Sequence, residues 1–363
     1  MLGRGELNMA NDIMATSNRF FDQIVGPLLE KHHPHIHQKI ACGFFGYGSE
    51  CLSMDDQLSR DHHWGLRIDA LLPRNYFAKY SETLTQHLKH FMPDTFEGIP
   101  LRDGHIPGTG IALEAMEDFL RRTIGIEHAP RTDKEWLDIP EVDIIHLING
   151  EVWHDPFGKY TAIRKALLGY YPDNVWYRRI AHWARYYSGM GVYALHRALQ
   201  RDNYQYAHTA FSRSLKWAIE LGFLLNRTYF PYDKWLLPFF KKLPNLTGDM
   251  VPLIEVAIKN QTPWEKRLDI LNNISDLLDN EMIRLQIISH HPRFSGNESS
   301  GYRLLEHAYG SIIKRLPKEI KHHVPCWDQV FLEEFHTSYV DSISLDEWNE
   351  ILCLTPEKGL IDP

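Results

Sequence analysis

The sequence predicts an α+β fold in which a small domain of strands and helices precedes an all-α domain. Between about residues 18 and 155, short apolar runs bounded by turn residues alternate with longer segments of helical periodicity. From about Thr161 onward, long helical periods dominate and strand patterns almost vanish. We therefore predict a flexible N-terminus at residues 1–17, a strand-and-helix domain at 18–160 and a helical domain at 161–363.

Three apolar segments of the first domain have the length and composition of strands. They are residues 39–46, 63–72 and 109–113, and Pro73 stops the second. Apolar residues recur at helical spacing from about 18 to 31, 75 to 91 and 116 to 124. Residues 138–148 are expected to hold a loop and another short apolar segment. The histidine-rich tract at 32–37 could bind metal, but polar residues ending a helix before a proline are the favoured interpretation.

The second domain is predicted to be helical throughout, with no repeat period. The expected helices have polar faces and apolar stripes at helical spacing. They cover residues 175–188, 192–200, 204–225, 234–242, 248–259, 263–288 and 301–313.

Composition restricts the classes of function that need consideration. The chain is 44% hydrophobic and 24% charged, which is ordinary for a soluble protein, and its net charge of −8 makes nucleic acid an unlikely partner. The four cysteines lack the spacing of a disulfide framework or a zinc ribbon. Neither a signal peptide nor an apolar run long enough to span a membrane is evident. We therefore expect a cytoplasmic protein with no membrane partner.

The most informative stretch runs from residue 43 to residue 72. An apolar entry leads into a glycine-rich turn that ends in Gly48 and Ser49, an acidic segment follows, and Asp61 and His63 open the second strand. Backbone N–H groups of such a turn can bind an anion. Side-chain alternation places Asp61 and His63 on one face of a strand. The stretch therefore predicts a phosphate-binding turn that faces a metal site.

The same residues also admit plainer structural roles. A glycine-serine turn is common, and Asp61 could cap a turn or form an ion pair with Arg60 or Arg67. Asp69 shares the strand face of Asp61, but in an extended strand it lies roughly 26 Å away. We therefore expect Asp69 to lie outside the site.

The segment GYGSECLSMDDQLSRDHHWG resembles the signature of the nucleotidyltransferase superfamily, whose polymerase-beta-like members carry Gly-Ser followed by an Asp-x-Asp strand. It is more closely similar to an uncharacterised bacterial family of unknown function within that superfamily. The likeness continues through GEVWHDPFGKYT (150–161), GYYPDNVWYRRIAHW (169–183) and FLLNRTYFPYDKW (223–235), and so covers about residues 40–245. The resemblance implies a small mixed sheet flanked by helices, followed by a helical domain.

The resemblance also implies roles for individual residues. Gly48 and Ser49 match the phosphate-binding turn, and Asp61 matches the first metal carboxylate. His63 stands where the superfamily has a second carboxylate, and imidazole suits Zn²⁺ or Mn²⁺ better than Mg²⁺. Glu114, at the end of the third predicted strand, is the candidate for a third carboxylate. The alternatives in the loop are Glu50, Asp55 and Asp56.

The helical half supplies candidate cations for a triphosphate. Arg213 and Lys216 are three residues apart and so share a helix face, and Lys234 follows in the segment PYDKW. Such side chains could clamp phosphates while aromatic rings stack on a base. Ion pairing with the many acidic residues is an equally good interpretation.

Together these features predict a metal-dependent nucleotidyltransferase. It would transfer a nucleoside monophosphate from a nucleoside triphosphate, with ATP as the expected donor, to a small-molecule acceptor. Mg²⁺ is the expected cofactor, with Mn²⁺ as the alternative, and Asp61, His63 and Glu114 are the predicted metal ligands and catalytic residues. One alternative is a nucleotide-binding regulatory protein in which His63 marks the loss of catalysis. A second is a protein–protein adaptor that uses the helical half.

Overall fold

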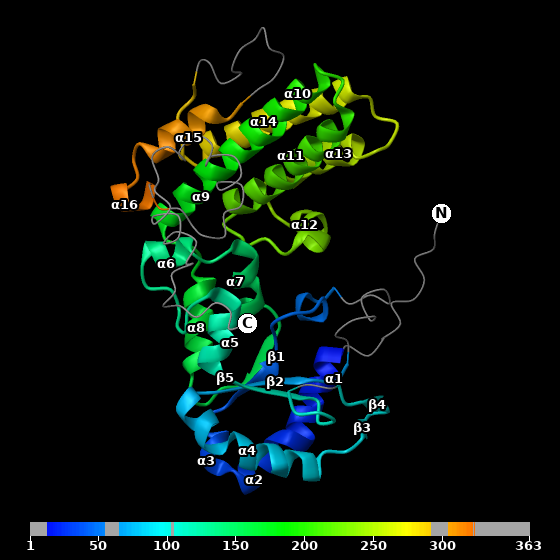
Figure 1. The fold of residues 1–363 in the computed structure, drawn as a ribbon, viewed down its shortest axis with the longest axis vertical. Helices are drawn as coiled ribbons and strands as arrows, with labels where there is room; N and C mark the ends of the chain where they lie inside the picture. The colour runs from blue at the N-terminus through cyan, green and yellow to red at the C-terminus, as the bar shows by residue number, and fades with distance from the viewer. Residues whose placement is uncertain (1–12, 55–64, 103–104, 292–303, 322, 324–363) are drawn as a thin grey trace, which may run out of the picture. The chain divides into compact units, whose positions relative to one another are not determined.

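The computed structural model describes residues 13–54, 65–102, 105–291, 304–321 and 323 (Figure 1). These residues form two compact units, which are described separately. The first unit comprises residues 1–130 and 143–169, and the second comprises residues 131–142 and 170–363. The boundary predicted after residue 160 falls within a helix of the first unit, α8 (Lys159–Leu168).

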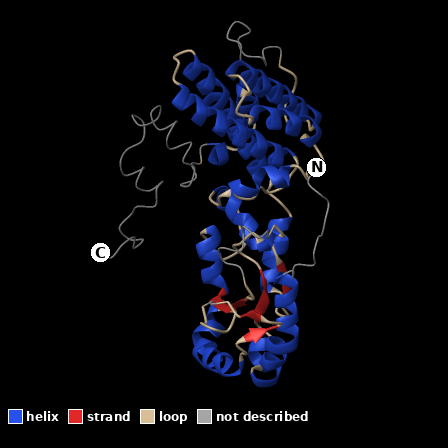
Figure 2. Ribbon diagram, turned by 90° about the vertical axis from the view of Figure 1, so that its right-hand side faces the viewer, coloured by secondary structure: helices blue, strands red, loops and turns tan. Residues whose placement is uncertain are grey.

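A four-stranded mixed sheet lies at the centre of the first unit, in the order β5-β2-β1-β6. Strand β1 (Ala41–Phe44) pairs antiparallel with β2 (Ile68–Leu72) and with β6 (Glu151–His154). Strand β5 (Ile111–Ala115) runs parallel to β2. Figure 2 shows these strands among the helices that surround them. A separate two-stranded hairpin pairs β3 (Thr95–Phe96) with β4 (Ile99–Pro100).

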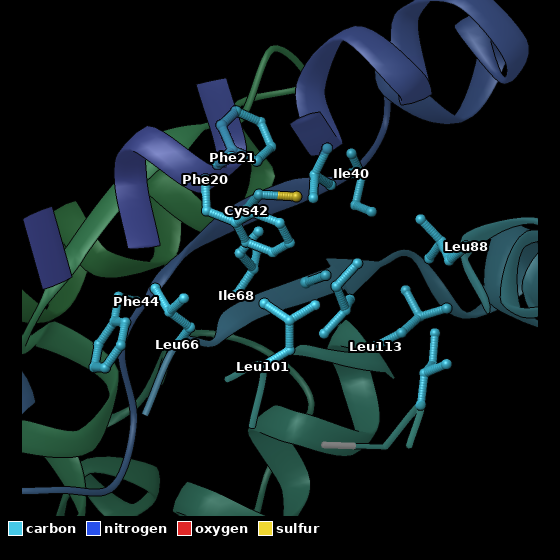
Figure 3. Packing of buried hydrophobic residues seen from close by; sticks show 14 of the residues in the cluster. Phe20, Phe21, Ile40, Cys42, Phe44, Leu66, Ile68, Leu88, Leu101 and Leu113 are labelled. Atoms are coloured by element: carbon cyan, nitrogen blue, oxygen red, sulfur yellow. The ribbon is translucent and has the colours of Figure 1, made fainter. Parts of the chain in front are cut away.

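One face of the sheet is covered by the hydrophobic core of the first unit. Ile68, Ala70 and Leu72 alternate along β2 and point into this core, as Ile111 and Leu113 do from β5 (Figure 3). The helices over this face supply apolar side chains at helical spacing. They are α1 (Ile13–Phe20), η1 (Phe21–Val25), α2 (Gly26–His32), α3 (Pro34–His37) and α4 (Arg74–Phe91).

The other strand residues therefore face away from this core. Asp69 and Leu71 of β2 and Ala112 and Glu114 of β5 occupy these alternate positions. Three further helices follow in the chain, namely α5 (Met116–Ile124), α7 (Glu141–Ile148) and α8. The alternation leaves two acidic residues on neighbouring strands on the same side of the sheet.

In the residues that the structure describes, the regular elements of the second unit are all helices. Arg179 is buried, forms an ion pair with Glu141 and donates to the carbonyl oxygens of Trp136 and Ile139 at 2.8 Å each. These bonds connect α6 (Asp133–Leu137) to α9 (Asp173–Arg185). The long helix α11 begins after Asn203, whose side chain accepts a hydrogen bond from the Tyr206 amide. The helices are α6 (Asp133–Leu137), α9 (Asp173–Arg185), η4 (Tyr186–Tyr193), α10 (Ala194–Leu199), α11 (Tyr204–Leu225), α12 (Asp233–Phe240), α13 (Thr247–Ala257), α14 (Trp264–Arg284), α15 (Glu306–Ile313) and α16 (Lys318–Lys321).

The predicted α+β class is confirmed, and several boundaries need correction. Residues 13–17 were predicted to be flexible, but they begin α1, and Ile13, Met14 and Ser17 are buried. Within the described residues, the second predicted strand begins at Ile68 rather than at residue 63. Residues 138–148 were predicted to hold a loop and a short apolar segment, and residues 141–148 form the helix α7. Among the helices that the structure describes, none is long and apolar enough to cross a membrane.

Candidate functional site

A glycine turn follows β1 in the first unit. Gly46 has φ +92° and Gly48 has φ +127°, a region that side chains with a Cβ rarely adopt. The Asn149 side chain fixes the turn, because it accepts from the Gly46 amide at 3.0 Å and donates to the Gly46 carbonyl at 2.6 Å. A Cβ at Gly48 would lie only 2.5 Å from the carboxylate of Glu50. This backbone therefore requires glycine at both positions.

The buried guanidinium of Arg67 also stabilises this turn through hydrogen bonds. Its Nη2 donates to the carbonyl oxygens of Phe45 at 2.9 Å and Tyr47 at 3.0 Å, and to the Cys51 sulfur at 2.9 Å. Its Nη1 donates to Glu50 at 3.0 Å, and its Nε donates to Asp69 at 3.1 Å. Arg67 thus joins the turn, the short helix η2 (Glu50–Leu52) and strand β2 into one charged network.

A pocket of about 490 Å³ opens beside this network, within the size range of small-molecule sites. Asp69 pairs in register with Ala112, and Leu71 pairs with Glu114. The register therefore brings two carboxylates from neighbouring strands into one cavity. The lining residues are Phe45, Gly46, Tyr47, Arg67, Asp69, Leu71, Arg102, His105, Ala112, Glu114, Phe119 and Arg122.

Three arginines and two acids set the charge of the pocket. Asp69 accepts from the Phe45 amide at 2.8 Å and from Arg67. Arg122 donates to both carboxylate oxygens of Glu114 at 2.9 Å, and this hydrogen bonding raises the pKa of Arg122. Burial, followed by the nearby charge of Arg67, lowers the pKa of Arg102. A cation that burial and a second cation both disfavour is stabilised when an anion binds beside it.

Aromatic side chains form part of the pocket wall. Tyr47 is 45% exposed, and its ring stacks on the ring of His146 with centroids 3.9 Å apart. Burial, followed by the charge of Asp143, raises the pKa of Tyr47. Burial lowers the pKa of His146, whose Nδ1 lies 3.2 Å from the Gly46 carbonyl oxygen. The pocket therefore combines cations with a stacking surface, the two features that a nucleotide needs.

The predicted site residues fall in three places. Asp61 and His63, together with Asp55 and Asp56, lie outside the described residues. Glu114 lines the pocket, inside β5 rather than at its end. Gly48 is half-buried, Ser49 is buried, and neither is among the residues that line the pocket. Glu50, the loop alternative, is buried in its ion pair with Arg67 at 3.0 Å.

The predicted phosphate-clamping cations belong to the second unit. Lys216 forms an ion pair with Asp233 at 2.6 Å and lies 3.8 Å from Glu220. Lys234 is exposed, with its amine 5.0 Å from the centroid of the Trp235 ring. Arg213 lies with Lys216 on α11 and is half-buried. These contacts of Lys216 match the alternative interpretation from the sequence, in which the lysine forms ion pairs with acidic residues.

The described residues do not form a metal site. Asp69 and Glu114 are the carboxylates that face the pocket, and an arginine neutralises each. No group of three or more histidine, cysteine or acidic side chains in the described parts of the chain could hold an ion. In the histidine tract, Nε2 of His33 lies 2.6 Å from Nδ1 of His87 on α4. Of the predicted Mg²⁺ or Mn²⁺ ligands Asp61, His63 and Glu114, the first two lie outside the described residues, so the metal site stays a prediction.

Sequence reasoning missed most of the pocket. Asp69 was expected to lie outside a site around Asp61, and that expectation is not tested because Asp61 lies outside the described residues. Gly65 has φ +145° and Leu66 bridges to Leu101, so the regular strand β2 starts only at Ile68. No local sequence pattern marked Arg102 or Arg122 as a site residue. The two arginines come close to Asp69 only through the pairing of β2 with β5 and through the segments next to these strands. The Arg67-x-Asp69 spacing on one strand face was the one signal that could have been used.

Residues 136–236 match a family model described as a domain of unknown function, DUF4037. This segment begins in α6 and ends in α12. A solved structure of a nucleotidyltransferase-like protein from Exiguobacterium sibiricum is similar to this chain with a TM-score of 0.38 and 12% identity, over 80% of this chain and 90% of that one. A likeness at this level does not establish a shared activity. None of the curated proteins matches the chain.

Proposed function

We propose that this chain is a nucleotidyltransferase whose nucleoside triphosphate, with ATP as the first candidate, binds in the pocket of the first unit. The observation that supports the proposal most is the convergence of Asp69 and Glu114 with three arginines in a cavity of about 490 Å³. Arginine is suited to bidentate contact with phosphate oxygens. The sequence resemblance supports the same reaction class.

In this reaction, an acceptor oxygen or nitrogen attacks the α-phosphorus of the triphosphate. The bond from that phosphorus to the bridging oxygen breaks, pyrophosphate leaves, and the acceptor loses a proton to a base. Arg102 and Arg122 would bind phosphate oxygens, and Tyr47 would offer its exposed ring to the base. Glu114 would accept the proton once Arg122 turned towards phosphate. Arg67 would hold the turn without touching the substrate.

Several predictions from the sequence remain part of the proposal. Mg²⁺, with Mn²⁺ as the alternative, would be held by Asp61 and His63, with Glu114 either as a further ligand or as the base, and would shield phosphate charge. Gly48 and Ser49 would contact the outer phosphates through the turn. The acceptor is proposed to be a small molecule, because the chain is acidic overall.

A pyrophosphate-release assay tests the proposal. The full chain is incubated with ATP, with Mg²⁺ or Mn²⁺, and with a panel of hydroxyl, amine and phosphate acceptors. Glu114→Gln is expected to lower kcat by about a hundredfold or more, a typical effect of removing a general base. Glu97→Gln is the matched control, because Glu97 is an exposed carboxylate of the same unit that pairs with Arg19 at 2.7 Å. Equal activity of the two variants would contradict the role of Glu114.

One observation favours nucleotide binding without catalysis. Both pocket carboxylates are already neutralised by arginines, Asp69 by Arg67 and Glu114 by Arg122. ATP binding without pyrophosphate release in either metal, across the whole acceptor panel, would support this second function. If ATP causes no shift in thermal unfolding at all, the protein–protein adaptor is favoured over both.

A further inference from the structure

The second unit contains a groove that shares no residue with the pocket of the first unit. Its volume is about 320 Å³, and it lies where η4, α10 and the start of α11 meet. Tyr193, Arg197, Arg201, Asn203 and Tyr206 are among its lining residues, and none of the described residues that line it is acidic. In Figure 1 the α10 label marks this end of the helical unit.

The helix that forms one wall is a π-helix of eight residues, Tyr186–Tyr193. Such helices are rare, are mostly single turns, and often occur at functional sites. One side of η4 is held firmly by the core of the unit. The Ser188 hydroxyl accepts from the Leu305 amide at 2.5 Å, and a Cβ at Gly191 would come within 2.6 Å of the Ser214 hydroxyl. Tyr193, the last residue of η4, lines the groove. The backbone that carries the Tyr193 ring is therefore held by the core of the unit.

The positive charge of the groove comes from two arginines four residues apart. Arg197 donates through Nη1 to the Gln200 side chain at 2.8 Å, and Arg201 donates through Nη1 to the Arg197 carbonyl at 3.1 Å. These bonds tether both side chains. Among the described residues they use only one nitrogen of each guanidinium, and a guanidinium has five N–H donors. Nε and Nη2 of each arginine can therefore donate to a ligand.

Two acidic residues lie near the groove without lining it, Asp202 and Glu306, and a carboxylate oxygen of Glu306 would lie 3.4 Å from a Cβ added to the lining residue Gly189. Asp202 follows Arg201, has φ +53°, and accepts from the Tyr204 hydroxyl at 3.3 Å. It is not a lining residue. Tyr193, by contrast, lines the groove and is 42% exposed, and Tyr206 lies on the α11 side. A rigid aromatic ring exposed beside two tethered cations can stack on a planar group.

We propose that this groove binds a small phosphorylated molecule that carries a planar ring. Arg197 and Arg201 hold the phosphate through Nε and Nη2, because the planar guanidinium matches the geometry of phosphate oxygens. Tyr193 and Tyr206 contact the ring. The volume of about 320 Å³ is at the lower end of the range for small-molecule sites and fits a single ring system with one phosphate. The groove is a second ligand site, independent of the function proposed for the first unit.

Calorimetric titration of the full chain with 4-nitrophenyl phosphate tests this proposal. The native chain should bind this probe more tightly than either inorganic phosphate or 4-nitrophenol, since each of these supplies only half of the recognition. Arg197→Gln and Arg201→Gln should each weaken binding about tenfold or more, as expected for the loss of a charged hydrogen bond. Tyr193→Ala should weaken binding of 4-nitrophenyl phosphate and leave inorganic phosphate unchanged.

Two control variants distinguish binding in this groove from nonspecific charge attraction and from binding in the first unit. Lys266→Gln removes one exposed positive charge from α14 in the same unit and should bind as the native chain does. Arg122→Gln removes a cation from the pocket of the first unit, so it can reduce only binding in that pocket and should keep the binding that Arg197→Gln loses. The proposal is overturned if the native chain does not bind the probe, or if Lys266→Gln weakens binding as much as Arg197→Gln. It is also overturned if Arg122→Gln abolishes binding while the groove variants retain it.

Discussion

Arg67 is buried at the centre of the first unit's site, and its replacement by methionine tests how that site is held together. Methionine has a similar length but no charge and no donor. Glu50, whose side chain is 2% exposed, then loses its cation, as does Asp69 at 17% exposure. Breaking a buried ion pair by removing one partner costs about 3–5 kcal/mol, because the remaining charge is left buried and uncompensated. We expect Arg67→Met to lower the free energy of unfolding of the first unit by this amount.

Urea unfolding, followed by circular dichroism, measures the effect. With a denaturant slope of about 1–3 kcal/mol per molar, a loss of about 3–5 kcal/mol should lower the midpoint by roughly 1–5 M. Arg121→Met is the control, because Arg121 is 60% exposed in its ion pair with Glu127. An exposed pair contributes at most about 1 kcal/mol, so this variant should unfold close to the native midpoint.

Two further variants identify the cause of the loss. Arg67→Lys keeps the charge but cannot reach five acceptors at once, so its stability should lie between those of the native chain and Arg67→Met. Adding Glu50→Gln to Arg67→Met removes one uncompensated charge and should restore part of the lost stability. If Arg67→Met unfolds at the same midpoint as Arg121→Met, the network does not hold the turn and our reasoning is refuted.

Three other predictions concern single residues. Gly48→Ala should destabilise the first unit by about 2 kcal/mol more than Gly125→Ala in thermal unfolding, because both have positive φ but only Gly48 meets a carboxylate. Burial, followed by the nearby charge of His87, lowers the pKa of His33. The free energy of unfolding should therefore fall as pH drops below about 6.5, and His33→Asn should flatten this pH dependence. Burial raises the pKa of Glu220 to about 7. The contribution of Glu220 to stability should therefore be present at acid pH and be lost as pH rises through 7. Glu220→Gln should abolish this pH dependence of the unfolding free energy, measured by urea titration.

Local patterns in the sequence were sufficient to predict the bounds of a helix that has a clear apolar stripe of its own. The segment 204–225 was predicted with its observed bounds, because apolar residues recur at helical spacing. The structure adds that the Asn203 side chain caps its start. The segment 116–124 was also predicted with its observed bounds, and Gly125 ends it in the left-handed region. The helix at 141–148 was missed because a run of only eight residues, five of them apolar, is too short to show a distinct period.

The pocket could not be predicted from local patterns, because its parts meet only through strand pairing. Glu114 and Asp69 are far apart in the chain and become neighbours because β2 and β5 pair in parallel. A parallel pair needs a crossover, and its register leaves no mark in either strand alone. Arg102 reaches the pocket because the residue before it bridges to Leu66. The turn, in contrast, was predictable, since Gly46 and Gly48 both adopt the positive φ that their identity suggested.

The contact between Glu114 and Arg122 links binding to catalysis in the proposed function. Arg122 holds both oxygens of Glu114, and a phosphate of higher charge entering the pocket would compete for the same guanidinium. Phosphate binding would then release Glu114 at the moment when a base is needed. Glu114→Gln removes the competing charge, so it should strengthen ATP binding in calorimetry while it lowers the rate of pyrophosphate release by about a hundredfold or more. A structural role for the pair predicts the opposite pattern, in which binding and turnover fall together with thermal stability.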